Sequence, residues 1–263
     1  MSYKRDNETN ARPIEEIEMK LYMDCTSGVS GNMIIGAFLN LGMPLEYLEE
    51  NIVKIVDPRS FNLIIDQRNF FDTEVTYFNT MVHSDAAMKG DLKANRMNAL
   101  KALKQLESSQ LSPNVAENAC RILSSLIDSK AKAHGCQREM VEFNYEGFSD
   151  TLIDILGACL GMEYFQVKDV ISSPLQVGSG KIKLAHREID IPSPMTRILL
   201  EGKPCYSTSQ LGEMVTPTGA AIVTGFASSY GLQKETGFSR VGFGLATESS
   251  GMDGMLKLYL SHV

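Results

Sequence analysis

A strand-to-helix junction near the start of the chain, LYMDCTSGVSGNMIIGAFL at residues 21–39, constrains the fold more than any other segment. Apolar and polar residues alternate over 20–24, which predicts a short strand. Apolar residues spaced three and four apart then predict a helix over 33–41, which Gly42 and Pro44 end. A single turn needs only a few residues, so the eight small, polar or reactive residues between these elements require a further explanation.

The rest of the chain also alternates irregularly between predicted strands and helices, so we expect a mixed α/β domain of unspecified topology over 19–263, after a flexible tail at 1–18. The clearest helix starts at Ser112 and Pro113 and ends at Gly135. Further helices are predicted at 45–55, 92–106 and 150–163 and after the loop 215–221, and further strands at 61–66, 73–82, 170–175, 181–185, 187–191 and 255–260.

Composition and charge exclude several classes of protein. The formal net charge of the 263 residues is -7, and the one lysine-rich stretch, 89–104, is interrupted by acidic and amide residues, so nucleic acid is excluded as a partner. The five cysteines never form a CxxC pair, which excludes a zinc ribbon and a disulfide framework. No signal peptide or membrane-spanning apolar run is found, so we expect a cytoplasmic protein without membrane contact.

Two polar loops that lead into helices are candidate anion sites. The first, SGVSGNM, offers hydroxyls, an amide and close backbone approach through Ser27, Gly28, Ser30, Gly31 and Asn32. The second, VTPTGAA, offers Thr216, Thr218 and Gly219, with Glu213 just upstream. Backbone N–H groups at a helix start favour a phosphate or carboxylate. A capped turn without a ligand remains the alternative for the first loop.

Two acidic residues and two histidines are candidate metal or proton-transfer groups. Asp150 and Asp154 share one face of a predicted helix; capping of that helix accounts for Asp150, whereas Asp154 lies among apolar residues and needs a partner. A ligand site and a structural ion pair are equal alternatives for Asp154. His134 and His186 are each either structural residues or metal ligands. A hydrolase that uses the two aspartates is disfavoured because no nucleophile motif accompanies them.

Several ordered motifs resemble those of the LarC-type nickel insertion proteins. LYMDCTSGVSGNM resembles the family's opening pattern, and the later motifs follow in the family's order: FLNLGMP, SKAKAHG, GFSDTLIDILGA, SSPLQVGSG, AHREIDIPSPMT, GEMVTPTGAA and GFGLAT. The match extends from about residue 20 to the end of the chain. The motif GEMVTPTGAA differs from the family's GELVTPTGAA at a single position.

The resemblance implies a role in making a nickel-pincer cofactor. Such proteins insert nickel into pyridinium-3,5-bisthiocarboxylate mononucleotide, a CTP-dependent chelatase reaction that matures lactate racemase. By this resemblance, we expect catalytic roles for Asp24, Asp150 and Glu213, metal delivery by His134, Asp154 and His186, and binding of the organic ligand by the two loops. CTP and a divalent cation are expected on a separate C-terminal domain or partner protein. Homo-oligomerisation stays open.

The chain also departs from the family pattern. Asn32 replaces an aspartate, and Glu142 and Asn144 stand where the family carries histidines. The family's His-rich loop is reduced to His83, Lys130 replaces an acidic residue, and the chain stops where the CTP-binding domain begins in the family. Because amide and carboxylate groups bind nickel less well than imidazole, a divergent paralogue that binds a nucleotide-like ligand or partner without metal chemistry is the alternative.

Overall fold

A seven-stranded mixed sheet forms the framework of the computed structural model, which describes residues 18–83, 96–184, 187–232, 237–246 and 254–262. Its strands, in spatial order, are β13 (Ser229–Tyr230), β6 (Val167–Ser172), β1 (Met19–Asp24), β15 (Met255–His262), β14 (Arg240–Leu245), β3 (Thr73–Val82) and β2 (Phe61–Phe70). Strands β13, β6 and β1 are parallel to one another, whereas β15 is antiparallel to both of its neighbours. The mixed α/β class predicted from the sequence is therefore confirmed.

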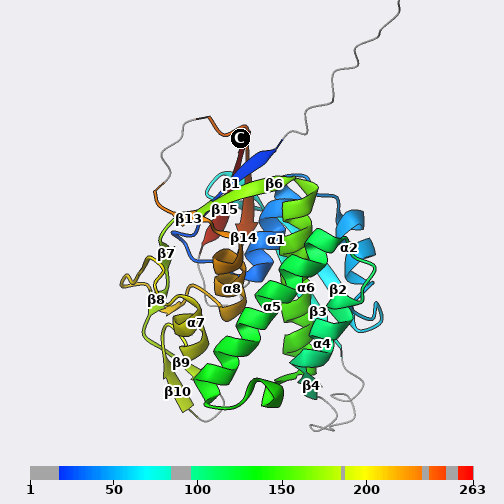
Figure 1. Cartoon of the computed structure of the whole chain (residues 1–263). Coiled ribbons are helices and arrows are strands. Elements are labelled where there is room, and N and C mark those ends of the chain that lie inside the picture. The colour runs from blue at the N-terminus through cyan, green and yellow to red at the C-terminus, as the bar shows by residue number, and fades with distance from the viewer. Residues whose placement is uncertain (1–17, 84–95, 185–186, 233–236, 247–253, 263) are drawn as a thin grey trace, which may run out of the picture.

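Seven α-helices of the described residues pack with this sheet: α1 (Gly31–Asn40), α2 (Leu45–Ile52), α4 (Ala99–Glu107), α5 (Pro113–His134), α6 (Tyr145–Tyr164), α7 (Pro194–Leu199) and α8 (Pro217–Phe226). Figure 1 shows α5 and α6 side by side in front of α1. None of the helices in the described ranges is long and apolar enough to cross a membrane.

Short strand pairs and one 3₁₀ turn complete the described structure. The pairs are β4 (Arg96–Asn98) with β5 (Glu142–Asn144), β7 (Leu175–Gln176) with β11 (Cys205–Tyr206), β8 (Gly178–Ser179) with β12 (Gly212–Glu213), and β9 (Lys181–Leu184) with β10 (Arg187–Asp190). The 3₁₀ turn spans Arg138–Met140. Three of the pairs belong to the stretch between β6 and α8, which surrounds the carboxyl ends of β1 and β6.

Helix α1 lies between the sheet and α6, and glycines of both neighbours leave the space that it occupies. A Cβ atom at Gly244 of β14 would collide with the carbonyl oxygen of Met33, and one at Gly161 of α6 would collide with the Phe38 ring. Seven of the ten residues of α1 are buried, among them the fully buried Phe38. Because these glycines carry no side chain, the backbone of α1 lies close to β14 and the Phe38 ring packs directly on α6, and both contacts fix the position of α1.

The sequence predicted the two ends of α5 correctly. The Ser112 hydroxyl accepts a hydrogen bond from the Val115 N–H at 3.2 Å, and Pro113 occupies the first helical position. Gly135 ends the helix with φ 63°, the left-handed conformation that favours glycine. These ends were predictable because the capping groups are local in sequence.

The predicted starts of two other helices were wrong. Helix α6 begins at Tyr145 rather than at 150, directly after β5, and α4 begins at Ala99 rather than at 92. Residues 96–98 instead form β4, which pairs with β5 across more than forty residues of sequence. The pairing of β4 with β5, which are distant in sequence, therefore sets where α4 and α6 begin, and no local sequence pattern predicts this pairing.

Two smaller predictions were adjusted by the structure. Helix α2 ends at Ile52, three residues before the predicted end. The strand predicted at 170–175 is β6, which ends at Ser172. The predicted tail at 1–18 lies, apart from Glu18, outside the described residues.

We predict that Gly161→Ala lowers the free energy of unfolding by about 2 kcal/mol, because the added methyl group overpacks the contact with Phe38. Gly147→Ala is the matched control, because it lies in the exposed first turn of the same helix and faces only the flexible Asn144 side chain. The control should leave stability unchanged or raise it by up to ~1 kcal/mol through helix propensity. Urea denaturation followed by circular dichroism measures both, and equal effects would contradict the proposed role of the α1–α6 contact.

Candidate functional site

The two predicted loop-to-helix junctions meet in the structure. The Val29 N–H donates to the Met214 carbonyl at 2.7 Å, and the Thr216 N–H donates to the Val29 carbonyl at 3.1 Å. Val29 and Val215 form a parallel bridge, so segments almost 190 residues apart lie side by side. The amino ends of α1 and α8 consequently lie together, at the carboxyl edge of β1.

Glycines make this meeting of the loops possible. A Cβ atom at Gly28 would collide with the Met214 carbonyl oxygen, and one at Gly219 would collide with that of Val29. Gly28 also has φ 91°, which side-chain-bearing residues rarely adopt. Both glycines were predicted as ligand-binding positions, and the structure gives each of them a contact between the loops.

The two hydroxyls at the helix starts act as caps. The Ser30 hydroxyl accepts from the Met33 N–H at 3.3 Å, and the Thr216 hydroxyl accepts from the Gly219 N–H at 3.1 Å. Each therefore satisfies one of the N–H groups that a helix start leaves free. The capped-turn alternative accounts for these two side chains, and the remaining N–H groups of both helix starts still favour an anion.

A third segment, the loop after β6, closes the site from another side. The Cys25 N–H donates to the Ser173 hydroxyl at 2.9 Å, and the Ser173 N–H donates to the Met23 carbonyl at 2.9 Å. Parallel strands bring their carboxyl ends to one edge of a sheet, where α/β proteins commonly bind ligands. The buried Ser173 was not among the predicted site residues, although a Ser-Ser pair directly after a predicted strand could have signalled it.

Asp154 is the buried acid of this region. Asp154 lies on α6, and its carboxyl group packs against Gly31, the first residue of α1. A Cβ atom at Gly31 would collide with that carboxyl group. Asp154 is 4% exposed, and its Oδ1 has no hydrogen-bond partner within the described part of the protein. Burial, helped by the charge of Asp150, raises the pKa of Asp154 well above its usual range. Of the two alternatives for this residue, a structural ion pair has no support among the described residues, because Asp150 is the one charged group found to shift the pKa of Asp154.

Asp150 does not cap α6, contrary to the prediction. Because the helix begins at Tyr145, Asp150 lies in its second turn, one turn before Asp154. Burial raises the pKa of Asp150 from 3.8 to about 6. The two aspartates therefore form one acidic pair along the face of α6, and neither is explained by capping.

The other predicted acids lie at the edges of the loops. The Asp24 carboxyl accepts from the Thr26 N–H and hydroxyl at 3.2 and 2.6 Å and lies 3.7 Å from Lys257 Nζ. The Glu213 carboxyl accepts from the Ser193 N–H at 3.3 Å and the Thr196 hydroxyl at 3.2 Å, which ties β12 to the start of α7.

The remaining loop residues lie nearby with smaller contacts. Ser27 is partly buried and faces Gly254, and the Asn32 amide lies 3.5 Å from that of Asn79 on β3. Thr218 is partly buried in the first turn of α8. The described members of both loops are thus brought into one region, as the prediction of a shared ligand site requires.

Comparison with known proteins identifies the family. The family model described as "Nickel insertion protein" matches residues 21–263. The chain belongs to this family.

The "Putative nickel insertion protein" of Geotalea daltonii is 32% identical over 244 residues, which cover 91% of this chain and 60% of the relative. The "Putative nickel insertion protein" of Dictyoglomus thermophilum is 33% identical, over 92% of this chain and 61% of the relative. The "Pyridinium-3,5-bisthiocarboxylic acid mononucleotide nickel insertion protein" of Desulfitobacterium hafniense is 31% identical, over 90% of this chain and 57% of the relative. The chain thus spans about 60% of the length of these relatives. No solved structure matched the chain.

The predicted metal ligands of this nickel insertion family member do not form a cluster in the described structure. His134 is exposed at the last residue of α5, whereas Asp154 is buried, and His186 lies outside the described residues. Nowhere in the described ranges do three His, Cys, Asp or Glu side chains gather closely enough to hold a metal ion. Cys25 is buried with its Sγ 3.7 Å from the Ser172 hydroxyl, and burial raises its pKa to about 12, so its thiol is neutral.

The departures from the family's histidine motif lie on β5. Glu142 and Asn144 are both exposed there. Lys130 of α5 reaches across, donates to the Glu142 carbonyl at 2.7 Å and lies 3.7 Å from the centre of the Phe143 ring. Burial lowers the pKa of Lys130. A lysine thus contacts the segment in which the resemblance led us to expect histidines.

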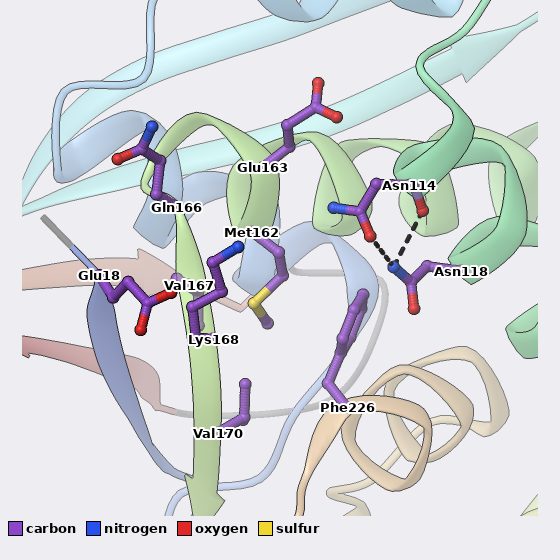
Figure 2. A pocket seen from close by; sticks show the side chains of 10 residues that line it. All are labelled: Glu18, Asn114, Asn118, Met162, Glu163, Gln166, Val167, Lys168, Val170 and Phe226. Carbon is purple, nitrogen blue, oxygen red and sulfur yellow. Dashed lines mark hydrogen bonds between the residues drawn. The ribbon is translucent and has the colours of Figure 1, made fainter. Parts of the chain in front are cut away.

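A surface pocket of about 560 Å³ lies at the other end of the same elements (Figure 2). It is formed by the amino end of β6, the carboxyl ends of α6 and α8 and the start of α5, with Lys168 and Phe226 among its lining residues. Its Asn114 and Asn118 are hydrogen-bonded to each other, and its Glu163 accepts from the Tyr47 hydroxyl at 2.9 Å. The pocket shares no residue with the predicted site.

We predict that the protein's free energy of unfolding decreases as pH rises from about 4 to about 6, through the contribution of Asp150. The folded state holds the Asp150 proton more tightly than the unfolded state does, so deprotonation favours unfolding. Asp150→Asn should therefore stabilise the protein by about 2 kcal/mol at pH 7 and by much less at pH 4.

Denaturant titrations at the two pH values measure this difference. Glu117→Gln, on the exposed side of α5, is the control and should leave the pH dependence unchanged. An Asp150→Asn variant that keeps the full pH dependence of wild type would contradict the prediction.

Proposed function

We propose that this chain binds pyridinium-3,5-bisthiocarboxylic acid mononucleotide and takes part in its metallation by nickel. Family membership supports the proposal, as does the name of the Desulfitobacterium hafniense relative. In this proposal nickel is a substrate that is delivered to the organic ligand. Two thiocarboxylates of that ligand would supply the soft donors that nickel favours, so a complete protein cage for the metal is not required.

The buried carboxyl group of Asp154, whose Oδ1 has no hydrogen-bond partner in the described structure, is the observation on which the proposal depends. An ionised carboxylate removed from water needs a cation, a donor or a proton. A nickel ion arriving at the amino end of α1 would neutralise the carboxylate. Helix starts carry partial positive charge, so those of α1 and α8 suit the phosphate and the carboxyl-derived groups of the mononucleotide.

We assign the other predicted residues accordingly. Ser27, Gly28, Ser30, Gly31 and Asn32 from the first loop and Thr216, Thr218 and Gly219 from the second would surround the organic ligand. Asp24, Asp150 and Glu213 would be the catalytic acids and bases, and His134 and His186 would deliver nickel to Asp154. The raised pKa of Asp150, about 6, suits a group that exchanges protons near neutral pH.

The rest of the proposal concerns the reaction as a whole. We propose a chelatase-type, lyase reaction in the cytoplasm that uses CTP and a divalent cation bound by a separate domain or protein, with lactate racemase as the recipient of the cofactor. The curated relatives extend well beyond the matched part, which leaves room in them for such a domain. The domain assignment 19–263 is likewise a proposal.

We predict that the purified chain takes up nickel in equilibrium dialysis only when the bisthiocarboxylate mononucleotide is present. Asp154→Asn keeps the size of the side chain but removes its charge, so it should weaken nickel uptake roughly 10-fold or more. The same substitution should raise the free energy of unfolding without ligand more at high pH than at low pH, because it removes the cost of ionising a buried carboxyl group. The exposed Glu117→Gln is the matched control and should change neither quantity.

The same dialysis tests the alternative of a paralogue without metal chemistry. The exposed Glu142 and Asn144, in place of histidines, favour that alternative. Retention of the mononucleotide without any nickel uptake would support it and contradict a metallation role. Failure to bind either compound would contradict both.

A further inference from the structure

Strand β2 forms one edge of the seven-stranded sheet. It is ten residues long, and among the described residues it pairs with β3 alone. The register between the two strands runs from Phe61 opposite Val82 to Phe70 opposite Thr73 without a bulge. A straight edge of this length is a template for another strand.

The hairpin geometry determines which backbone groups face the free side. Phe71 and Asp72 form a two-residue turn with φ 47° and 58°, so the closing pair, Phe70 and Thr73, is the hydrogen-bonded type. Bonded pairs then recur at every second residue, and the bond from the His83 N–H to the Ser60 carbonyl at 2.6 Å fits this alternation. The groups of the odd-numbered residues therefore point away from β3, namely those of Leu63, Ile65, Gln67 and Asn69.

Three features that commonly protect an edge strand are missing from β2, namely a proline, a lysine and a β-bulge. The strand FNLIIDQRNF contains no proline or lysine, and its pairing with β3 is regular. Three large apolar side chains of the β2–β3 hairpin are exposed, Ile64 at 36%, Phe71 at 86% and Met81 at 50%. The only two charges of the strand, Asp66 and Arg68, have opposite signs and lie two residues apart.

We propose that β2 pairs antiparallel with β2 of a second copy of this chain, with Gln67 facing Gln67 of the partner subunit. This register connects the outward-facing backbone groups of both copies. It places Asp66 opposite Arg68 of the partner subunit, twice by symmetry, and Ile64 opposite Phe70 of the partner subunit. Opposite charges and an aliphatic–aromatic pair are favourable across strands. Centring the pair on Asp66 instead would place two carboxylates face to face.

The pairing closes with two copies. An antiparallel contact between identical strands is two-fold symmetric, so the free backbone groups of β2 are hydrogen-bonded in both copies at once. The opposite edge of the sheet is β13, which has only two residues and offers little for further strand addition. The inference therefore specifies a dimer with a continuous fourteen-strand sheet. It does not depend on the proposed nickel function.

Sedimentation velocity and light scattering of the full chain over a range of concentrations test this proposal. We expect a dimer for wild type and for Asn69→Ala. Asn69→Pro should be monomeric, because it removes an outward N–H and leaves the bonds to β3 intact. Circular dichroism and thermal unfolding must show that both variants are folded. A wild-type monomer at all concentrations, or a dimer that survives Asn69→Pro, would overturn the proposal.

A charge exchange tests the register itself. Arg68→Asp places like charges opposite each other and should weaken the dimer ~10-fold or more. The double variant Asp66→Arg with Arg68→Asp restores opposite charges and should restore the dimer. A double variant that stays as weak as the single one would overturn the register, whatever the variants do to nickel binding.

Discussion

The close packing of α1 between the sheet and α6 is the constraint on which the rest of this structure depends. The helix is almost completely buried, and the glycines of β14 and α6 remove the side chains that would hold it at an ordinary distance. With α1 fixed in this way, its first residue, Gly31, lies against Asp154, and the preceding loop lies against the loop before α8. The candidate site is thus a direct consequence of core packing.

That packing leaves a carboxyl group in an unfavourable place. Asp154 is buried and its Oδ1 has no partner in the described structure, while the charge of Asp150 one turn away further disfavours ionisation of Asp154. A folded protein retains such a pair at a cost in stability, which is typical of sites that serve a ligand or a reaction. In the function proposed above, a nickel ion would be the partner of this pair.

Local sequence patterns predicted a large part of the fold. The ends of α5 and the strand-loop-helix unit around α1 depend on groups within a few residues of one another. Ser30 and Thr216, which were predicted as ligand-binding residues, act as helix caps. The starts of α4 and α6 were missed because they depend on the pairing of β4 with β5, which no local signal encodes. The error at α6 mattered, because it gave Asp150 a capping role that it does not have.

The sequence by itself determined which residues could form a site: the two polar loops, the acidic pair on one helix face and the motifs of the nickel insertion family. Only the tertiary structure decided that the loops join through Val29, Met214 and Thr216, and that exposed His134 and buried Asp154 lie in different environments. The physical reason is the range of the interactions. Capping and periodicity act within one or two turns, whereas burial and the pairing of distant backbone segments depend on how the whole chain packs.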